Sequence, residues 1–230
     1  MGESVKMTSR GKPMRIAVCI SGAQRLANNA LTYFSRQLPE DAEVDYFGYM
    51  WGGDYATEAE LAQAITDKIE GRVGTIRVRI DNDFTPVIAF PHIQYPETNL
   101  ENAMRMFYGV KKANDMKTIY ELENKFRYDV VVRQRSDVGL SSSLDFHKFL
   151  ALVEHFIVFP EDGHWRGGLN DQFAFSSSTN MDVYSSVYNF IQDHCMHGCP
   201  LHPETLLRFH LNKMRKDPIL APLNAVILRD

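Results

Sequence analysis

The sequence predicts a single-domain α/β fold, a mainly parallel sheet flanked by helices, in a chain of 230 residues. Short continuous apolar runs, such as 16–20 and 130–132, are typical of strands buried on both faces. These runs alternate with helix-like segments of about a dozen residues, and neighbouring parallel strands need such a crossover between them. A chain of this length buries roughly 70% of its unfolded surface around one core.

The first third of the chain predicts three strands and two helices. Ser21 and Gly22 follow the first apolar run and favour a tight turn at its end. Thr57 and Glu60 have the spacing of a capping box, so we expect a helix to begin there. The expected elements are a strand at 16–20, a helix at about 26–38, a strand at 44–49, a helix at 57–69 and a strand at 75–80.

The rest of the chain begins with an irregular connection. Pro86, Pro91 and Pro96 interrupt residues 81–96, which we expect to lie as a loop over the sheet. Three consecutive valines make 128–134 the clearest strand of the sequence. The other expected elements are a helix at about 100–126, strands at 156–159 and 172–175, and helices at about 180–194 and 203–214 that close the fold.

Composition excludes several classes of protein. The 25 basic and 29 acidic residues give a net charge of −4 and are scattered, which disfavours a protein that coats nucleic acid. The longest apolar stretch, 219–228, is far shorter than the roughly 20 residues of a transmembrane helix. Residues 1–13 are polar, without the apolar segment of a signal peptide, and predict a flexible tail before a domain at 14–230. We therefore expect a cytoplasmic protein without a transmembrane segment.

Three cysteines, Cys19, Cys195 and Cys199, cannot all pair within the chain, and Cys19 lies in an apolar strand-like run. Cys195 and Cys199, together with His194, His197 and His202, provide enough ligands for zinc. Their spacing matches no common structural zinc site, which favours a loop with buried thiols.

Polar residues follow the predicted strands, where parallel sheets bind ligands. The segment 21–25 places a hydroxyl, an amide and a guanidinium at the start of a helix, which suits a phosphate or nucleotide. A plain turn with exposed Gln24 and Arg25 is the alternative. Arg133, Arg135 and Asp137 end the clearest strand, and such a charge cluster calls for an anionic ligand or a metal.

Six short segments occur in an order that resembles a known family. They are Ser21-Gly22-x-x-Arg25, the strand that ends at Trp51, and residues 106–113, 128–137, 170–176 and 202–207. Together they resemble small nucleotide-sugar glycosyltransferases of the GT-A fold, found in viral and bacterial glycan synthesis. The resemblance covers nearly the whole chain beyond residue 14, and it rests on the order and spacing of the motifs.

The resemblance implies a GT-A-like, Rossmann-type sheet and a set of site residues. Asp137 and His202 would hold Mn²⁺ or Mg²⁺ on the diphosphate, where the metal acts as a Lewis acid. Asp171 would be the base that accepts the proton of the acceptor hydroxyl, its alternative role being a helix or turn cap. The nucleotide sugar would contact Ser21, Gly22, Gln24, Arg25, Trp51, Tyr108, Lys112, Arg133 and Arg135.

The chain departs from the family pattern at the metal site. The family has two aspartates one residue apart, and Arg135 stands in place of the first. Arg133 and Arg135 are thus alternative partners of the diphosphate, through forked donors. Asp81-Asn82-Asp83 is a rival metal site with the Asp-x-Asp spacing, or else turn chemistry. His164 and Trp165 could offer a stacking face for a sugar ring.

The sequence as a whole predicts an enzyme that moves a sugar from a nucleotide-diphosphate sugar to a glycan hydroxyl. Its expected partners are that donor and a glycan acceptor, with no nucleic acid. Two alternatives remain open at this point. One is a nucleotidyltransferase, and the other is a catalytically inactive glycan-binding domain, which the arginine at position 135 would favour.

Overall fold

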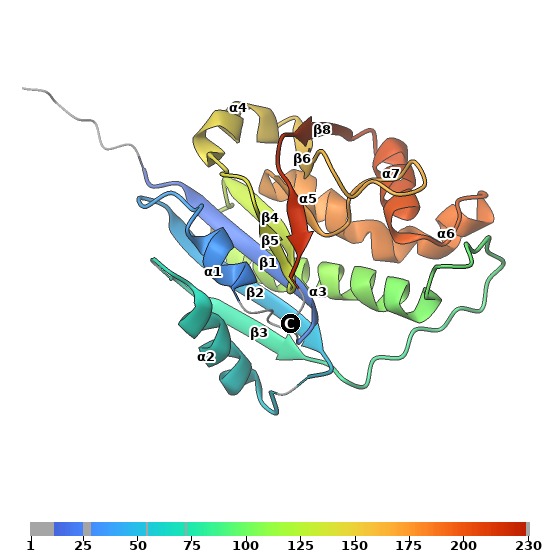
Figure 1. The fold of residues 1–230 in the computed structure, drawn as a ribbon, viewed down its shortest axis with the longest axis horizontal. Helices are drawn as coiled ribbons and strands as arrows, with labels where there is room; N and C mark the ends of the chain where they lie inside the picture. Colours follow the sequence, from blue (N-terminus) through green and yellow to red (C-terminus); the bar gives the residue numbers. More distant parts are fainter. Residues whose placement is uncertain (1–11, 25–28, 54, 72, 229–230) are drawn as a thin grey trace, which may run out of the picture.

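A seven-stranded sheet forms the centre of the computed structural model, which describes residues 12–24, 29–53, 55–71 and 73–228 (Figure 1). The strand order is β3-β2-β1-β4-β7-β6-β8. Only β7 runs antiparallel to its neighbours, so the predicted α/β fold with a mainly parallel sheet is confirmed. The strands are β1 (Arg15–Ala23), β2 (Glu43–Trp51), β3 (Ile76–Ile80), β4 (Val130–Arg135), β6 (Phe156–Pro160), β7 (Phe173–Ser176) and β8 (Asp217–Ala221).

Helices cover both faces of this sheet (Figure 1). They are α1 (Ala30–Ser35), α2 (Glu58–Lys68), α3 (Leu100–Asn124), α4 (Leu150–Val153), α5 (Ser178–Ser185), α6 (Ile191–Met196) and α7 (Pro203–Lys213), with 3₁₀ turns η1 (Phe146–Phe149) and η2 (Ser186–Phe190). Alternate residues of β1 divide the core. Ile16, Val18 and Ile20 pack with α1 and α2, whereas Ala17 and Cys19 pack with α3, α5, α6 and α7.

The predicted strands and helices of the first third are largely confirmed. Thr57 and Glu60 form the expected capping box at α2, and the Thr57 hydroxyl accepts a hydrogen bond from the Glu60 amide at 3.2 Å. The turn predicted at Ser21–Gly22 is wrong, because β1 continues to Ala23 in register with the last residues of β2. The helix expected at 26–38 is shorter, since α1 spans 30–35 and residues 25–28 lie outside the described residues.

The end of the chain differs from the prediction. Helix α7 does not close the fold, because β8 and a further strand, β9 (Ala225–Ile227), follow it. β8 pairs with β6, and β9 pairs with the short strand β5 (Val138–Leu140). The helix predicted at 180–194 is divided into α5, η2 and α6. The flexible tail predicted at 1–13 falls almost wholly on residues 1–11, which lie outside the described residues.

The three cysteines are free and buried, as predicted for Cys19. Burial raises the pKa of the Cys199 thiol to about 12 and that of Cys195 to about 11, so neither is a thiolate at neutral pH. His197 is exposed, and its Nδ1 lies 3.4 Å from Asp193 Oδ1. Among the described residues, no group of three or more potential ligands is arranged to hold a metal ion, which leaves the zinc interpretation without support.

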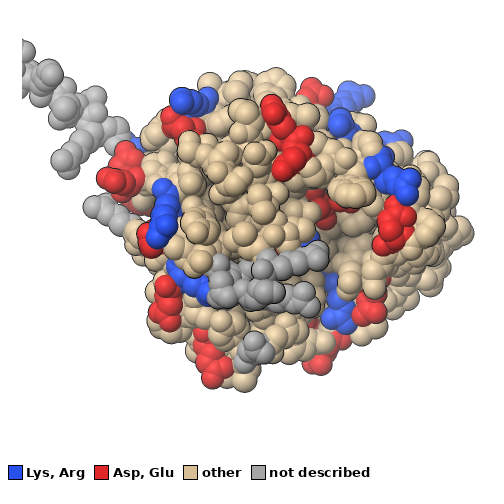
Figure 2. Space-filling model, in the orientation of Figure 1, with Lys and Arg blue, Asp and Glu red and all other residues tan. Residues whose placement is uncertain are grey.

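Two further features bear on the composition argument. Within the described part of the chain, no helix combines the length and apolarity needed to cross a membrane. On the face drawn in Figure 2, described basic and acidic side chains are interspersed, and no basic stripe is visible there.

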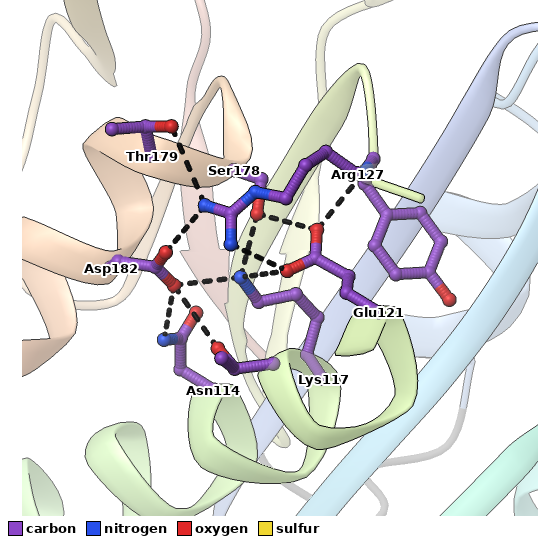
Figure 3. Close-up of polar contacts among 9 residues, drawn as sticks. Asn114, Lys117, Glu121, Arg127, Ser178, Thr179 and Asp182 are labelled. Atoms are coloured by element: carbon purple, nitrogen blue, oxygen red, sulfur yellow. Dashed lines mark hydrogen bonds and ion pairs between the residues drawn. The ribbon is translucent and has the colours of Figure 1, made fainter. Parts of the chain in front are cut away.

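A buried charged cluster joins α3 to α5 (Figure 3). The Lys117 ammonium, fully buried, donates to Ser178 Oγ and Asp182 Oδ1, both at 2.7 Å, and to Glu121 Oε2 at 3.1 Å. Arg127 Nη2 lies 2.6 Å from Asp182 Oδ2. Although burial acts in the opposite direction, Lys117 lowers the pKa of Asp182. Each of the three Lys117 donors has an acceptor, and the cluster fixes α3 against α5.

A buried histidine pair lies between α6 and α7. His194 Nε2 is 3.0 Å from His210 Nδ1, and His210 Nε2 is 2.9 Å from the Val183 carbonyl oxygen. Burial lowers the pKa of His210 from 6.5 to about 4. Both imidazoles are therefore neutral in the folded protein at neutral pH.

His210 is expected to make the protein less stable as the pH falls from 7 to 5. The unfolded chain takes up a proton at His210 below about pH 6.5, whereas the folded protein does not until about pH 4. Over this interval the unfolding free energy should fall by about 2 kcal/mol through His210. Urea unfolding of wild type and His210→Gln at the two pH values measures this contribution as the difference between the two profiles. If the unfolding free energies of the two proteins changed equally between pH 7 and pH 5, the contribution of His210 would be contradicted.

Candidate functional site

A cavity of about 580 Å³ opens at the carboxyl ends of the central strands. The strand order reverses at β1, with β2 and β3 on one side and β4 on the other, and open α/β sheets bind ligands at such a switch point. The lining residues come from these strand ends, from Trp51 of β2, from residues 97–106 before and in α3, from 171–172 and from 202–204. The location is the one that the strand-end argument predicted.

Close contact between the ends of β1 and β4 forms one wall of the cavity. Gly22 has a φ angle of +150°, and a Cβ atom there would lie 2.6 Å from Ser136 Oγ. The Ser136 hydroxyl donates to the Ala23 carbonyl at 2.8 Å. Glycine is therefore required at position 22 for its conformation and for this approach. Ser21 and Gly22, both predicted as donor-binding residues, do line the cavity.

Arg133 is a buried cation with unused donors. Its side chain lines the cavity, yet the residue is only 2% exposed. Nη1 donates to the Ser21 carbonyl at 3.3 Å and to the Gln134 carbonyl. Nε and Nη2 have no hydrogen-bond partner among the described residues. An unpaired buried guanidinium donor is energetically costly, so this position favours an anionic ligand that supplies acceptor oxygens.

Arg135 and Asp137 form an ion pair on the same wall. Arg135 Nε lies 2.7 Å from Asp137 Oδ1, and Nη2 donates to Oδ2 at 2.9 Å. Oδ2 thus accepts a hydrogen bond from the guanidinium, whereas Oδ1, although close to Nε, has no hydrogen-bond partner among the described residues. In this site Asp137 is the ion-pair partner of Arg135.

Asp171 faces the two arginines from the loop before β7. Asn170, its neighbour, accepts hydrogen bonds from the amides of Gln172 at 2.8 Å and Phe173 at 3.2 Å, so Asn170 caps this turn. Asp171 is 9% exposed and lines the cavity. Burial raises the pKa of its carboxyl, although Arg133 and Arg135 act to lower it. The structure therefore gives the capping role to Asn170 and leaves the Asp171 carboxyl at the cavity.

Glu204 is a cavity residue that the sequence argument quoted in a motif but did not select. It lies in the first turn of α7, where burial, followed by the Asp171 charge, raises the pKa of its carboxyl to about 7. His202 Nδ1 is 3.3 Å from Glu204 Oε2. Gly168 allows the loop before Asp171 to reach α7, because a Cβ atom there would lie 2.2 Å from the Glu204 carbonyl carbon. Asp171 and Glu204 are thereby brought into one cavity.

Trp51 lies on the wall formed by β2, as expected for a donor-binding residue. Gly109 of α3 makes room for it, since a Cβ atom there would be 2.8 Å from the Trp51 ring. Gln24 does not line the cavity. Its side-chain oxygen accepts a hydrogen bond from the Tyr55 amide at 3.0 Å and holds the loop after β2. Arg25 lies outside the described residues.

Tyr108 and Lys112 lie in a different place from the other expected donor-binding residues. They line a second cavity of about 440 Å³, formed with Tyr49, Arg79 and Asp81. The Tyr108 ring stacks on Phe84 with centroids 3.8 Å apart, and Lys112 Nζ is 5.3 Å from its centroid. The structure does not bring these two residues to the first cavity.

Asp81 performs turn chemistry. Its Oδ1 accepts from the amides of Asp83 at 3.2 Å and Phe84 at 3.0 Å, and its Oδ2 accepts from the Tyr49 hydroxyl. These contacts support the turn interpretation of 81–83 over the rival metal site. His164 is likewise held in its loop, with Nε2 2.9 Å from the Pro160 carbonyl oxygen, while Trp165 is exposed outside the cavity.

The residues expected to hold Mn²⁺ or Mg²⁺ do not form a suitable donor set. Asp137 and His202 both line the cavity, but Asp137 is ion-paired with Arg135, and His202 contacts Glu204. Two guanidinium groups face the same space. A dication prefers several carboxylate and carbonyl oxygens without a competing cation beside them, so the residues present do not fit the ion.

Neither a model of a known protein family nor a curated protein sequence matches this chain. The functional argument therefore rests on the cavity and its residues.

Proposed function

We propose that the protein is a glycosyltransferase of GT-A-like fold that moves a sugar from a nucleotide-diphosphate sugar to a glycan hydroxyl. One observation carries the proposal. The buried Arg133, with two unpartnered donor atoms, and the Asp171 carboxyl, with a raised pKa, share one cavity at the reversal of strand order. An anion site beside a buried carboxyl is what transfer from a diphosphate to a hydroxyl requires.

The chemistry divides between the two sides of the cavity. On the donor side, the guanidinium groups of Arg133 and Arg135 stabilise the charge that collects on the diphosphate as its bond to the anomeric carbon breaks. On the acceptor side, the attacking hydroxyl oxygen forms the new glycosidic bond and gives its proton to an Asp171 carboxylate oxygen. Trp51 offers an aromatic face at the edge of the donor side.

The decisive experiment is product analysis. We expect the full chain, incubated with a panel of nucleotide sugars and oligosaccharide acceptors, to release nucleoside diphosphate and extend an acceptor by one sugar. A nucleotidyltransferase would instead consume a nucleoside triphosphate and a sugar phosphate and release pyrophosphate. A glycan-binding domain would bind an acceptor in calorimetry without binding any donor, and either outcome would refute the proposal.

Arg133→Ala is expected to weaken binding of the active donor by about 1.5–3 kcal/mol, the usual contribution of hydrogen bonds to a charged group. This corresponds to roughly a 10- to 150-fold higher Kd. Calorimetry with the nucleotide sugar measures the change, and the melting temperature reports whether the fold is retained. Arg133→Lys, which keeps the charge but loses the fork, should lie between wild type and Arg133→Ala. Equal donor affinity in all three proteins would place the diphosphate elsewhere.

A further inference from the structure

Asp137 forms an ion pair with a cation of the protein itself. Arg135 Nη2 donates to Oδ2 at 2.9 Å, and Nε lies 2.7 Å from Oδ1, which has no hydrogen-bond partner among the described residues. A divalent ion at Asp137 would have to displace this guanidinium and then remain beside it. The position of Arg135 is the one at which the resembling family has its first aspartate, so the charge at this position is reversed.

Arg133 and Arg135 are positioned to act together. Residues two apart in a strand project from the same face, and their Cα atoms lie roughly 7 Å apart, within the reach of two long side chains toward one diphosphate. Both side chains line the cavity. Arg133 contributes the unpartnered Nε and Nη2, and Arg135 contributes a guanidinium held in place by Asp137.

From these contacts we infer that the arginine pair replaces the divalent cation and that the cavity binds a diphosphate without metal. Guanidinium forks match phosphate oxygens in geometry and keep their charge at every physiological pH. In this arrangement Asp137 is a positioning residue for Arg135. The inference rests on the proposed function for the identity of the anion, and it specifies how that anion is held.

Titration calorimetry with inorganic pyrophosphate tests the inference on the full chain. One titration contains EDTA and the other contains Mg²⁺. We expect the two Kd values to agree within about threefold, because the protein's own cations supply the positive charge. A Kd that rises tenfold or more in EDTA, or no binding in EDTA, overturns the inference.

Arg135→Asp provides the sharper comparison. It creates two aspartates one residue apart and removes one guanidinium, so pyrophosphate binding in EDTA should weaken at least about tenfold. Mg²⁺ should then restore binding in the variant while leaving wild type unchanged. The side chain of Arg135 is 35% exposed, and circular dichroism verifies that the variant is folded. Wild-type affinity of Arg135→Asp in EDTA would overturn the inference.

Arg79→Asp is the matched control. It makes the same change in charge at an exposed arginine that pairs with Glu58 at 3.0 Å outside the first cavity. Its pyrophosphate affinity should equal that of wild type.

Failure of this inference is distinguishable from failure of the proposed function. Sugar transfer that occurs only with added metal, together with pyrophosphate binding that EDTA abolishes, would retain the glycosyltransferase and refute the arginine pair. Metal-independent pyrophosphate binding that Arg135→Asp weakens, without transfer from any nucleotide sugar, would retain the arginine pair and refute the glycosyltransferase.

Discussion

Asp171→Asn is expected to lower the turnover number by about 10²–10⁴-fold, the usual contribution of a general base. The amide keeps the shape of the side chain but cannot accept the proton of the attacking hydroxyl. Donor affinity should change little, because the lost interaction operates on the acceptor proton in the transition state. Single-turnover kinetics with saturating donor and acceptor measure the chemical step, and calorimetry measures donor binding.

A second aspartate provides the control for a purely structural effect. Asp145 caps the 3₁₀ turn η1 through a 3.1 Å hydrogen bond from the His147 amide and lies away from the cavity. Asp145→Asn should leave turnover unchanged. If Asp171→Asn lowered only the melting temperature, its role would be structural. If it abolished donor binding and spared the chemical step, Asp171 would belong to the donor side.

The same kinetic and binding measurements also test Glu204, the second carboxyl of the cavity with a raised pKa. Its pKa of about 7 leaves it partly protonated at neutral pH, so only a fraction of the molecules have the Glu204 carboxylate that could accept a proton. A large loss in Glu204→Gln with near-normal turnover in Asp171→Asn would transfer the role of base to Glu204.

The position of the site was predictable because it depends on strand ends. The apolar runs of β1 and β4 are evident in the sequence, and the polar residues that follow them meet at one edge of a parallel sheet. Ser21 and Arg133 were found in this way, whereas Asp171 was expected from the family resemblance, and all three line the cavity. The nearby Gly168 has no local signal for its role, because its contact partner, Glu204, is distant in the sequence.

Helix phase explains why two motif residues were misplaced. The α3 residues at the first cavity are Asn102, Ala103 and Met106; Met106 is four residues after Asn102 and three after Ala103, so the three share one helix face. Tyr108 and Lys112 are also four apart, but they share another face and line the second cavity. A short motif on a helix does not reveal which face meets the sheet edge.

The elements missed at the end of the chain depend on partners that are distant in the sequence. β9 has three residues and is a strand only because it pairs with β5, nearly ninety residues earlier. β8 contains a proline, which by itself argues against a strand, and it lies at the edge of the sheet beside β6. Local pattern carries no information about either pairing.

Lys117→Met is expected to lower the unfolding free energy by about 3–5 kcal/mol, the usual loss when one partner of a buried ion pair is removed. Methionine matches the length of the side chain, so the change removes the charge with little change in packing. Glu121, at 1% side-chain exposure, and Asp182 would then lose the ammonium that contacts both of them (Figure 3). Urea unfolding at pH 7 measures the difference.

The exposed pair at the end of the same helix provides the comparison. Arg77 and Glu123 are 2.9 Å apart, but their side chains are 39% and 52% exposed, so Glu123→Gln should lower stability by less than about 1 kcal/mol.

Unfolding in acid provides a second measurement of the Lys117 contribution. Lys117 lowers the pKa of Asp182, so that stabilisation is present above the unfolded pKa of 3.8 and is lost as the pH falls through the folded value. The difference in unfolding free energy between wild type and Lys117→Met should therefore become smaller in acid. A loss below about 1 kcal/mol at pH 7 would mean that Arg127 alone neutralises the two carboxylates.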